Sequence, residues 1–348
     1  MDEKTTTNGA GDPFQQVHDN DAHQEDARRT IGIEQLVQQI KETADKLIRD
    51  HANRGDVKLL STALKELRYC FKVFGPYHNR RKVTVFGSAR LPLEHPACQS
   101  AVEFGRRMAE AGFMVITGAA SGIMEAGHVG AGRDASIGIN ILLPFEQSAN
   151  TIIAGDAKLM HLKYFFTRKL LFVKESDAVA LFPGGFGTQD EGFEVLTLIQ
   201  TGKSHMFPII MVDEPGGDYW KQWHHYIEHV LMGRGLISPS DLALYKVTDS
   251  VDVALAEVLN FYRVYHSMRY VGDELVLRLQ QELRPELLDK LRTDFADIVV
   301  RGIIEQSGAL PAEANDVQLA AMPRLRFHFD RRHLGRLRML IDVINLEG

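Results

Sequence analysis

The sequence has little of what marks several large classes of protein. Its 348 residues include only two cysteines, Cys70 and Cys98, which is too few for a disulfide framework. The formal net charge of -6 argues against a nucleic-acid-binding protein, because such proteins are usually basic. No apolar run approaches the roughly 20 residues of a membrane-spanning helix. We therefore expect a cytoplasmic protein with neither a nucleic-acid nor a membrane partner.

Several motifs of cofactor-binding and catalytic proteins are also absent. The chain contains no G-x-G-x-x-G dinucleotide loop, no Walker A loop and no G-x-S-x-G nucleophile elbow. No histidine, cysteine or acidic residues have the spacing of a metal site, and His224-His225 is interpreted as part of a solvated helix. These absences disfavour a nicotinamide-dependent oxidoreductase, an ATPase and a serine hydrolase, and we predict no bound metal or cofactor.

Shifts in the spacing of apolar residues divide the chain into parts. Apolar side chains at helical spacing run from Ile33 to Leu47 and again from Leu60 to Phe74, where Gly75-Pro76 ends the pattern. The residues before these helices are polar, carry no signal peptide and are expected to be disordered. We predict a disordered tail, an N-terminal helical segment, a main domain and a C-terminal extension, at residues 1–30, 31–80, 81–265 and 266–348.

The main domain alternates short apolar runs with helical patterns. The runs expected to form strands cover residues 83–86, 113–116, 137–143, 178–182 and 208–212. Strands that are apolar along their whole length must be covered on both faces, which predicts a parallel sheet between helices. With right-handed crossovers, the result is a Rossmann-like, doubly wound α/β fold.

The C-terminal extension shows a mixture of patterns and is predicted to be α+β. Leu275 to Leu291 is interpreted as an amphipathic helix that Pro285 interrupts. Leu325 to Phe329 alternates in polarity, which indicates a strand, and Arg331 to Ile344 is expected to form the last helix. The sequence assigns this extension no function.

Small residues follow the first two predicted strands, at the end of the sheet where ligands of doubly wound folds bind. After the first strand, Gly87, Ser88 and Arg90 could meet an anion, although an ordinary turn explains the pattern equally well. The second strand leads into small residues that either approach a sugar or phosphate or pack a helix closely against the sheet. The candidate ligand-binding residues there are Gly118, Ser121, Gly122, Met124 and Glu125.

The strongest local signal follows the fourth predicted strand, in residues 183–191. Gly184, Gly185 and Gly187 expose the backbone just before a predicted helix. The free N–H groups and the positive end of that helix favour a phosphate, to which the hydroxyl of the next threonine can add a hydrogen bond. Glu191, one turn later, either complements the helix dipole or faces a reacting sugar.

A fourth unusual segment is the helical pattern from Tyr164 to Phe172. It contains Arg168, with Phe165 three residues before it and Phe172 four residues after it, so that the three side chains share a helix face. Arg168 therefore either extends along this aromatic surface toward solvent or points into a cleft.

Together these segments resemble the "lonely guy" or LOG family, also labelled lysine-decarboxylase-like. Residues 183–191 match the family motif P-G-G-x-G-T-x-x-E at every fixed position, and Arg168-Lys169 is similar to the Arg-Lys pair that precedes it. Residues 116–126 are similar to the family's T-G-G-G-x-G-I-M-E-A segment, with Ala119-Ala120 in place of two glycines.

The resemblance extends over roughly residues 82–262 and points to a subgroup. Residues 140–147 and Asn150 are similar to the longer bacterial members of the family. The N-terminal helices and the C-terminal extension lie outside the resemblance.

The resemblance implies a phosphoribohydrolase, which cleaves a nucleoside 5′-monophosphate, such as AMP or a cytokinin nucleotide, into free base and ribose 5-phosphate. It implies that Arg168 and Glu191 are the catalytic pair and that the chain forms a homodimer or a larger homo-oligomer. The substrate- and phosphate-binding residues are then predicted to be Gly87, Ser88, Gly118, Ser121, Gly122, Met124, Glu125, Arg168, Lys169, Gly184, Gly185, Gly187 and Thr188.

Two chemical roles fall to Glu191 in this hypothesis. A carboxylate near C1′ can stabilise the positive charge of the breaking glycosidic bond and can deprotonate the attacking water. Asp190 points about 100° away on the helix and is not expected to share the task. The alternatives are a non-catalytic carrier of a phosphorylated cofactor, similar to molybdenum-cofactor carriers, and a nucleosidase for other purine or pyrimidine monophosphates.

Overall fold

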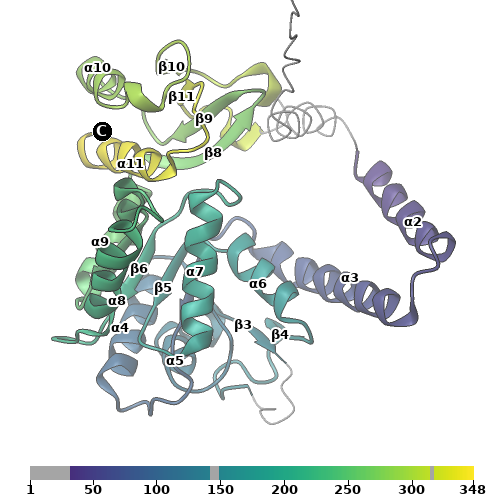
Figure 1. Cartoon of the computed structure of the whole chain (residues 1–348). Coiled ribbons are helices and arrows are strands. Elements are labelled where there is room, and N and C mark those ends of the chain that lie inside the picture. Colours follow the sequence, from purple (N-terminus) through teal and green to yellow (C-terminus); the bar gives the residue numbers. More distant parts are fainter. Residues whose placement is uncertain (1–31, 142–148, 314–316) are drawn as a thin grey trace, which may run out of the picture.

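The computed structural model describes residues 32–141, 149–313 and 317–348 of the chain (Figure 1). The tail predicted for residues 1–30 lies outside the described residues. So do residues 142–147, which include the end of the third predicted strand and part of the segment that resembles the longer bacterial subgroup.

A seven-stranded parallel sheet forms the centre of the molecule, with the strand order β4-β3-β2-β1-β5-β6-β7 (Figure 1). Its strands are β1 (Lys82–Phe86), β2 (Met114–Thr117), β3 (Ser136–Ile141), β4 (Leu159–Leu162), β5 (Ala178–Leu181), β6 (Ile209–Val212) and β7 (Tyr245–Thr248). The chain runs outward from β1 to β4 and then returns to place β5 on the other side of β1. The prediction of a doubly wound, Rossmann-like α/β fold is confirmed.

Helices cover both faces of this sheet, because its central strands are buried on both sides. Val83 and Val85 of β1 belong to a core that also contains residues of α4 (Pro96–Glu110), α5 (Ile123–Ala135) and α9 (Val251–Phe261). Phe86 belongs to the opposite core, with residues of α6 (Phe165–Lys174) and α7 (Phe186–Gln200). The alternation of side chains along a strand thus builds a core on each face.

The two edge strands, β4 and β7, are not among the strands predicted from the sequence. Both are short and are only partly buried: His161 of β4 is exposed, and in β7 only Tyr245 is buried. An edge strand that faces solvent lacks the continuous apolar run that identified the central strands.

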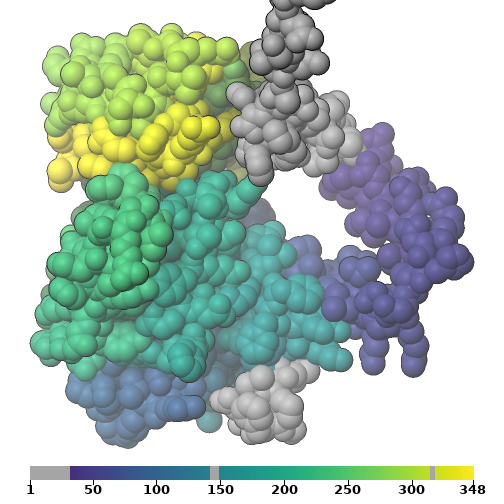
Figure 2. Space-filling view, in the orientation of Figure 1, coloured from purple at the N-terminus to yellow at the C-terminus, as the bar shows by residue number. Residues whose placement is uncertain are grey.

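The two predicted N-terminal helices are present as α2 (Ile33–Arg49) and α3 (Arg54–Phe74). They form an arm that extends from the sheet at α6, drawn in purple in Figures 1 and 2. Helix α3 buries Ala63, Cys70 and Phe74, whereas α2 buries none of its side chains. In the described part of the chain, neither this arm nor any other helix has the length and apolarity needed to cross a membrane.

The C-terminal residues form a second, antiparallel sheet that packs above the first (Figure 1). Its order is β10-β11-β9-β8, formed by β8 (Tyr265–Val271), β9 (Glu274–Leu279), β10 (Glu305–Ser307) and β11 (Arg324–Phe327). Helices α10 (Pro285–Asp294) and α11 (Leu334–Glu347) belong to the same C-terminal part. Side chains of both helices lie in the core that also contains side chains of α7. The predicted strand near Leu325 and the predicted last helix are confirmed.

The prediction of a helix that begins at Leu275 is wrong over its first part. Residues 274–279 form β9, which pairs with β8 and β11. Leu275, Leu277 and Leu279 repeat with the period of a strand, and Arg278 on the other face is buried against Glu313 at 2.7 Å. The helix α10 starts only at Pro285, in the first turn, where the missing N–H of proline costs no hydrogen bond.

Candidate active site

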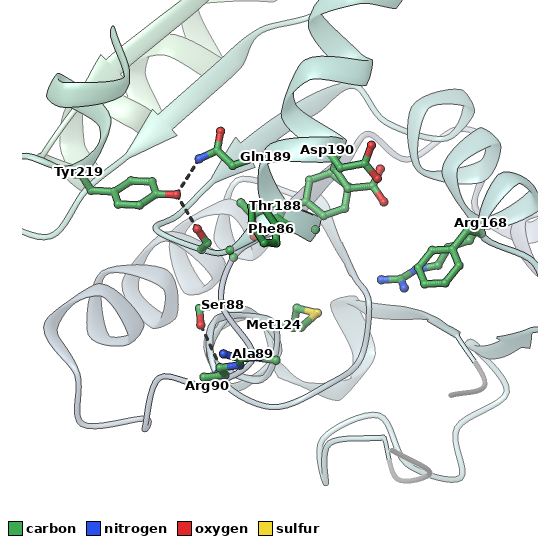
Figure 3. Close-up of a pocket in the computed structure, with 17 residues that line it drawn as sticks. Phe86, Ser88, Ala89, Arg90, Met124, Arg168, Thr188, Gln189, Asp190 and Tyr219 are labelled. Carbon is green, nitrogen blue, oxygen red and sulfur yellow. Dashed lines mark hydrogen bonds between the residues drawn. The ribbon is translucent and has the colours of Figure 1, made fainter. Parts of the chain in front are cut away.

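A cavity of about 880 Å³ lies beyond the carboxyl ends of β1 and β5, where the strand order reverses (Figure 3). This is the position at which doubly wound sheets bind ligands. Its wall is formed by the turn after β1, by the start of α7, and by side chains from α5, α6 and α8 (Tyr219–Tyr226).

The start of α7 presents an uncapped helix end to the cavity. Gly185 is the N-cap residue and has no side chain to accept a hydrogen bond, and the first backbone bond to Gly185 O comes from Gln189 N at 3.1 Å. A Cβ atom at Gly185 or Gly187 would meet nothing within 4 Å, whereas one at Gly184 would lie 2.1 Å from Thr188 Oγ1. Gly185 and Gly187 therefore leave open space before the helix end, and Gly184 allows the loop to pack on Thr188.

Tyr219 fixes this loop from the other side. Its hydroxyl donates a hydrogen bond to Gly184 O at 2.5 Å and accepts one from Gln189 Nε2 at 2.6 Å (dashed lines in Figure 3). Both ends of the glycine loop are thus bonded to one phenol on α8.

Arg168 points into the cavity from α6, on the side away from Tyr219 (Figure 3). Its guanidinium carbon lies 5.1 Å from the centre of the Phe172 ring, within the range of a cation–π interaction. A Cβ atom at Gly118 would lie 2.4 Å from Arg168 Nη2, so the glycine after β2 provides the space that this guanidinium occupies. Of the two orientations that the sequence left open, the structure has the one toward the cleft.

Glu191 is only 7% exposed, although it borders the cavity. Burial raises the pKa of its carboxyl to about 7, and Asp190 and Glu194 act in the same direction. The positive charges of Lys169 and Arg168 oppose this rise without cancelling it.

Lys169 connects α6 to the acidic side chains of α7. Its ammonium lies 2.6 Å from Glu194 Oε2, 2.9 Å from Asp190 Oδ2 and 3.9 Å from Glu191 Oε2. Most of its hydrogen-bonding capacity is therefore taken up by the two neighbours of Glu191.

The site thus combines three features around one cavity: a helix end that favours an anion, a guanidinium, and a buried carboxyl group whose pKa lies near neutrality. Such groups can bind a phosphate and transfer a proton at a neighbouring bond. Among the described residues, no group of three or more histidine, cysteine or acidic side chains converges to hold a metal ion.

Similarity to known proteins covers the segment that contains most of these residues. A family model described as "Possible lysine decarboxylase" matches residues 116–258, which contain Arg168, Glu191 and the glycine loop. A probable cytokinin riboside 5′-monophosphate phosphoribohydrolase of Oryza sativa subsp. japonica is 29% identical over 164 residues. A cytokinin riboside 5′-monophosphate phosphoribohydrolase of Rhodococcoides fascians is 33% identical over 91 residues. Over this segment the chain is similar to the LOG family.

The likeness to these LOG proteins is partial in length. The rice alignment covers 46% of this chain and 63% of its relative, and the Rhodococcoides alignment covers 26% and 44%. The arm formed by α2 and α3 and the C-terminal sheet lie outside the matched residues 116–258.

Solved structures with a similar arrangement share little sequence with the chain. The molybdenum cofactor binding protein of Rippkaea orientalis is 19% identical, with 51% of this chain and 93% of that chain covered and a TM-score of 0.35. DNA processing protein A of Helicobacter pylori is 13% identical, with 53% and 83% covered and a TM-score of 0.37.

The structure brings most of the predicted site residues together. Those that border the cavity are Gly87, Ser88, Met124, Arg168, Gly184, Gly185, Gly187, Thr188 and Glu191. Those that do not are Gly118, Ser121, Gly122, Glu125 and Lys169. Gly118 and Lys169 adjoin the site through Arg168 and through the acids of α7, as described above.

Ser121 and Gly122 instead hold the turn after β1. Ser121 Oγ donates to Ala89 O at 2.8 Å. Gly122 has a positive φ of 66°, and a Cβ atom there would lie 2.3 Å from Ser88 O. The two residues therefore support the part of the cavity wall formed by Ser88 and Ala89.

Of the two alanines that stand in place of glycines in this loop, Ala119 has a strained backbone. Ala119 has a φ of 62°, which an L-residue other than glycine rarely adopts. Its N–H donates to Thr117 Oγ1 at 2.9 Å and its carbonyl accepts from Asn150 N at 2.8 Å. Asn150 Nδ2 also donates to Ala120 O at 3.2 Å, so this loop is held by its own neighbours.

Tyr219, Gln189, Asp190 and Phe186 also border the cavity and were not among the predicted site residues. Tyr219 lies in the segment after β6, one strand beyond the glycine loop. The rule that ligands bind beyond strand ends applies to this segment as well, but no motif there distinguishes Tyr219 from a surface residue.

Proposed function

We propose that this chain hydrolyses the N-glycosidic bond of a nucleoside 5′-monophosphate to give free base and ribose 5-phosphate. The observation that carries the proposal is the convergence of Arg168, Glu191 and the uncapped start of α7 on one cavity. The names of the rice and Rhodococcoides relatives support the same reaction.

The 5′-phosphate is assigned to the start of α7. Backbone N–H groups without partners and the positive end of the helix dipole favour a dianion there. Gly185 and Gly187 leave the space for it, because a side chain at either position would project into the cavity.

The sugar is assigned to the region between Arg168 and Glu191. Ionised Glu191 stabilises the positive charge that develops on the ribose ring and accepts a proton from the attacking water. A pKa of about 7 suits this role, because a base works best when its pKa lies near the working pH. Arg168 orients the substrate and neutralises negative charge as the bond to the base breaks.

The substrate within this class is proposed to be AMP or a cytokinin riboside monophosphate. We also propose a homo-oligomer, supported by the exposed apolar side chains of the arm, such as Ile33, Leu36 and Ile40. Light scattering on the purified chain tests the oligomeric state directly.

A panel of nucleoside 5′-monophosphates and the matching nucleosides tests the function. We expect base release from at least one monophosphate and little from its nucleoside, because the phosphate supplies much of the binding. Glu191→Ala and Arg168→Ala should each lower turnover on the order of 100-fold or more, whereas Glu42→Gln on the exposed face of α2 should not. Tight binding of a monophosphate without any base release would favour the non-catalytic carrier instead.

A further inference from the structure

One carboxylate of the N-terminal arm, that of Glu66 on α3, binds at the start of α6. Glu66 Oε1 accepts a hydrogen bond from Lys163 N at 2.7 Å, and Oε2 accepts one from Thr167 Oγ1 at 2.7 Å. The two donors lie on either side of the start of α6, which is the helix that carries Arg168.

Glu66 places a carboxylate beside the start of α6, where the helix has no side-chain cap of its own. The N-cap residue is Tyr164, whose side chain makes no capping hydrogen bond, and the first turn contains no acidic residue. An oxygen acceptor and a negative charge at a helix start both stabilise it. Glu66 supplies the negative charge from a distant part of the chain, and its two oxygens bind the Lys163 N–H before the helix and the Thr167 hydroxyl in its first turn.

The carboxylate of Glu66 contacts the turn from which Arg168 extends. Thr167, the residue before Arg168, is fully buried, and its hydroxyl lies 2.9 Å from Tyr164 O as well as next to Glu66. The first backbone bond of α6, from Arg168 N to Tyr164 O, is long at 3.4 Å. Glu66 therefore adds a contact to a turn whose own backbone bond is long.

We propose that Glu66 is a positioning residue for Arg168, so that the arm outside the matched family region is part of the active-site structure. The inference rests on the proposed function in one respect, namely that Arg168 acts on the substrate. Glu66 does not border the cavity and has no contact with the substrate in this account.

Docking of the arm itself does not depend on this carboxylate. Helix α3 buries Ala63, Cys70 and Phe74, and Lys174 of α6 lies 5.1 Å from the centre of the Phe71 ring. Glu66→Gln keeps the size of the side chain but turns one of its two acceptors into a donor. The variant should therefore fold, but it loses the negative charge and can no longer accept from Lys163 N and Thr167 Oγ1 at the same time.

The test compares Glu66→Gln with Glu42→Gln, an identical change on the exposed α2. We expect Glu66→Gln to lower kcat roughly tenfold, because a misplacement of about 1 Å can cost on the order of a hundredfold and this change should be smaller. Its thermal midpoint should stay close to that of the wild type. Thr167→Val, which removes the other partner, should lower kcat similarly. Glu42→Gln should leave kcat unchanged. A kcat for Glu66→Gln equal to that of Glu42→Gln would overturn the proposal.

A double-mutant cycle separates positioning from general support of the fold. In an Arg168→Ala background, Glu66→Gln should cost no further activity, because the group that it positions is absent. The same fold-loss in both backgrounds would contradict the proposal. If the wild type releases no base from any monophosphate, the proposed function fails. Crystal structures of the wild type and Glu66→Gln would still decide whether Glu66 positions Arg168. A displaced Arg168 side chain in the variant supports positioning, and an unchanged one refutes it.

Discussion

The ammonium of Lys169 lies 3.9 Å from Glu191 Oε2, beyond hydrogen-bonding distance. It is held there by Glu194 and Asp190, which it contacts at 2.6 Å and 2.9 Å. Glu191 is thus buried beside a cation that other carboxylates largely neutralise, and the pKa of its carboxyl stays near 7. This arrangement determines the protonation state of the proposed base.

The pH dependence of the reaction should report this arrangement. If Glu191 acts when ionised, kcat/KM rises with pH through an apparent pKa near 7. Glu194→Gln frees Lys169 to approach Glu191, and should lower the apparent pKa of this rise by about one pH unit. Lys169→Met should raise this apparent pKa. The substrate phosphate ionises near pH 6 whichever protein is used. An apparent pKa that is the same in all three proteins would therefore belong to the substrate and not to Glu191.

Stability should depend on pH through the same carboxyl group. Because the pKa of Glu191 is raised on folding, the native state binds more protons than the unfolded chain between about pH 4.5 and pH 7, and stability falls as pH rises through this window. Glu191→Gln removes this penalty. Its free energy of unfolding in urea should exceed that of the wild type by roughly 1–3 kcal/mol at pH 8 and by little at pH 4. A difference that is equal at both pH values would show that burial does not shift this group.

Two glycines of the α7 loop should respond to alanine in opposite ways. Gly184→Ala places a Cβ atom 2.1 Å from Thr188 Oγ1, so we expect a loss of about 1–3 kcal/mol of stability from overpacking. Gly187→Ala meets no atom within 4 Å and lies within a helix, so the fold should be unaffected or slightly more stable. Its methyl group nevertheless enters the proposed phosphate space. Calorimetry should show weaker binding of ribose 5-phosphate to Gly187→Ala, and equal binding would place the phosphate elsewhere.

The hydroxyl of Tyr219 should matter for the glycine loop and little for the fold. Tyr219→Phe removes the bonds to Gly184 O and Gln189 Nε2. The loss of about 1 kcal/mol for such a bond corresponds to a rise in KM of roughly fivefold. Tyr226→Phe, at an exposed position of the same helix, is the matched control and should leave KM unchanged. Equal kinetics of the two variants would exclude a role for this phenol.

The sequence predicts the central sheet well because its strands are apolar along their length, as in Val83–Phe86 and Ala178–Leu181. It does not predict β4 and β7, which face solvent at the sheet edges. The stretch after Leu275 misleads because leucine, arginine, glutamine and glutamate favour helices, whereas pairing with β8 and β11 decides the outcome.

The candidate site shows the same division. A continuous motif reveals the glycine loop and Glu191, and a family pattern reveals Arg168. The contacts of Tyr219 with Gly184 and of Glu66 with Thr167 join distant segments, and one of the partners is a backbone carbonyl. No spacing rule in a single sequence indicates such pairs.

Product analysis with AMP tests the central claim most directly. Wild-type protein and Glu191→Gln are incubated with AMP near pH 8, and adenine, ribose 5-phosphate, adenosine and inorganic phosphate are quantified over time. We expect equal amounts of adenine and ribose 5-phosphate from the wild type. The variant should be slower by on the order of 100-fold or more. Adenosine and phosphate as products, or equal rates for the two proteins, would contradict it.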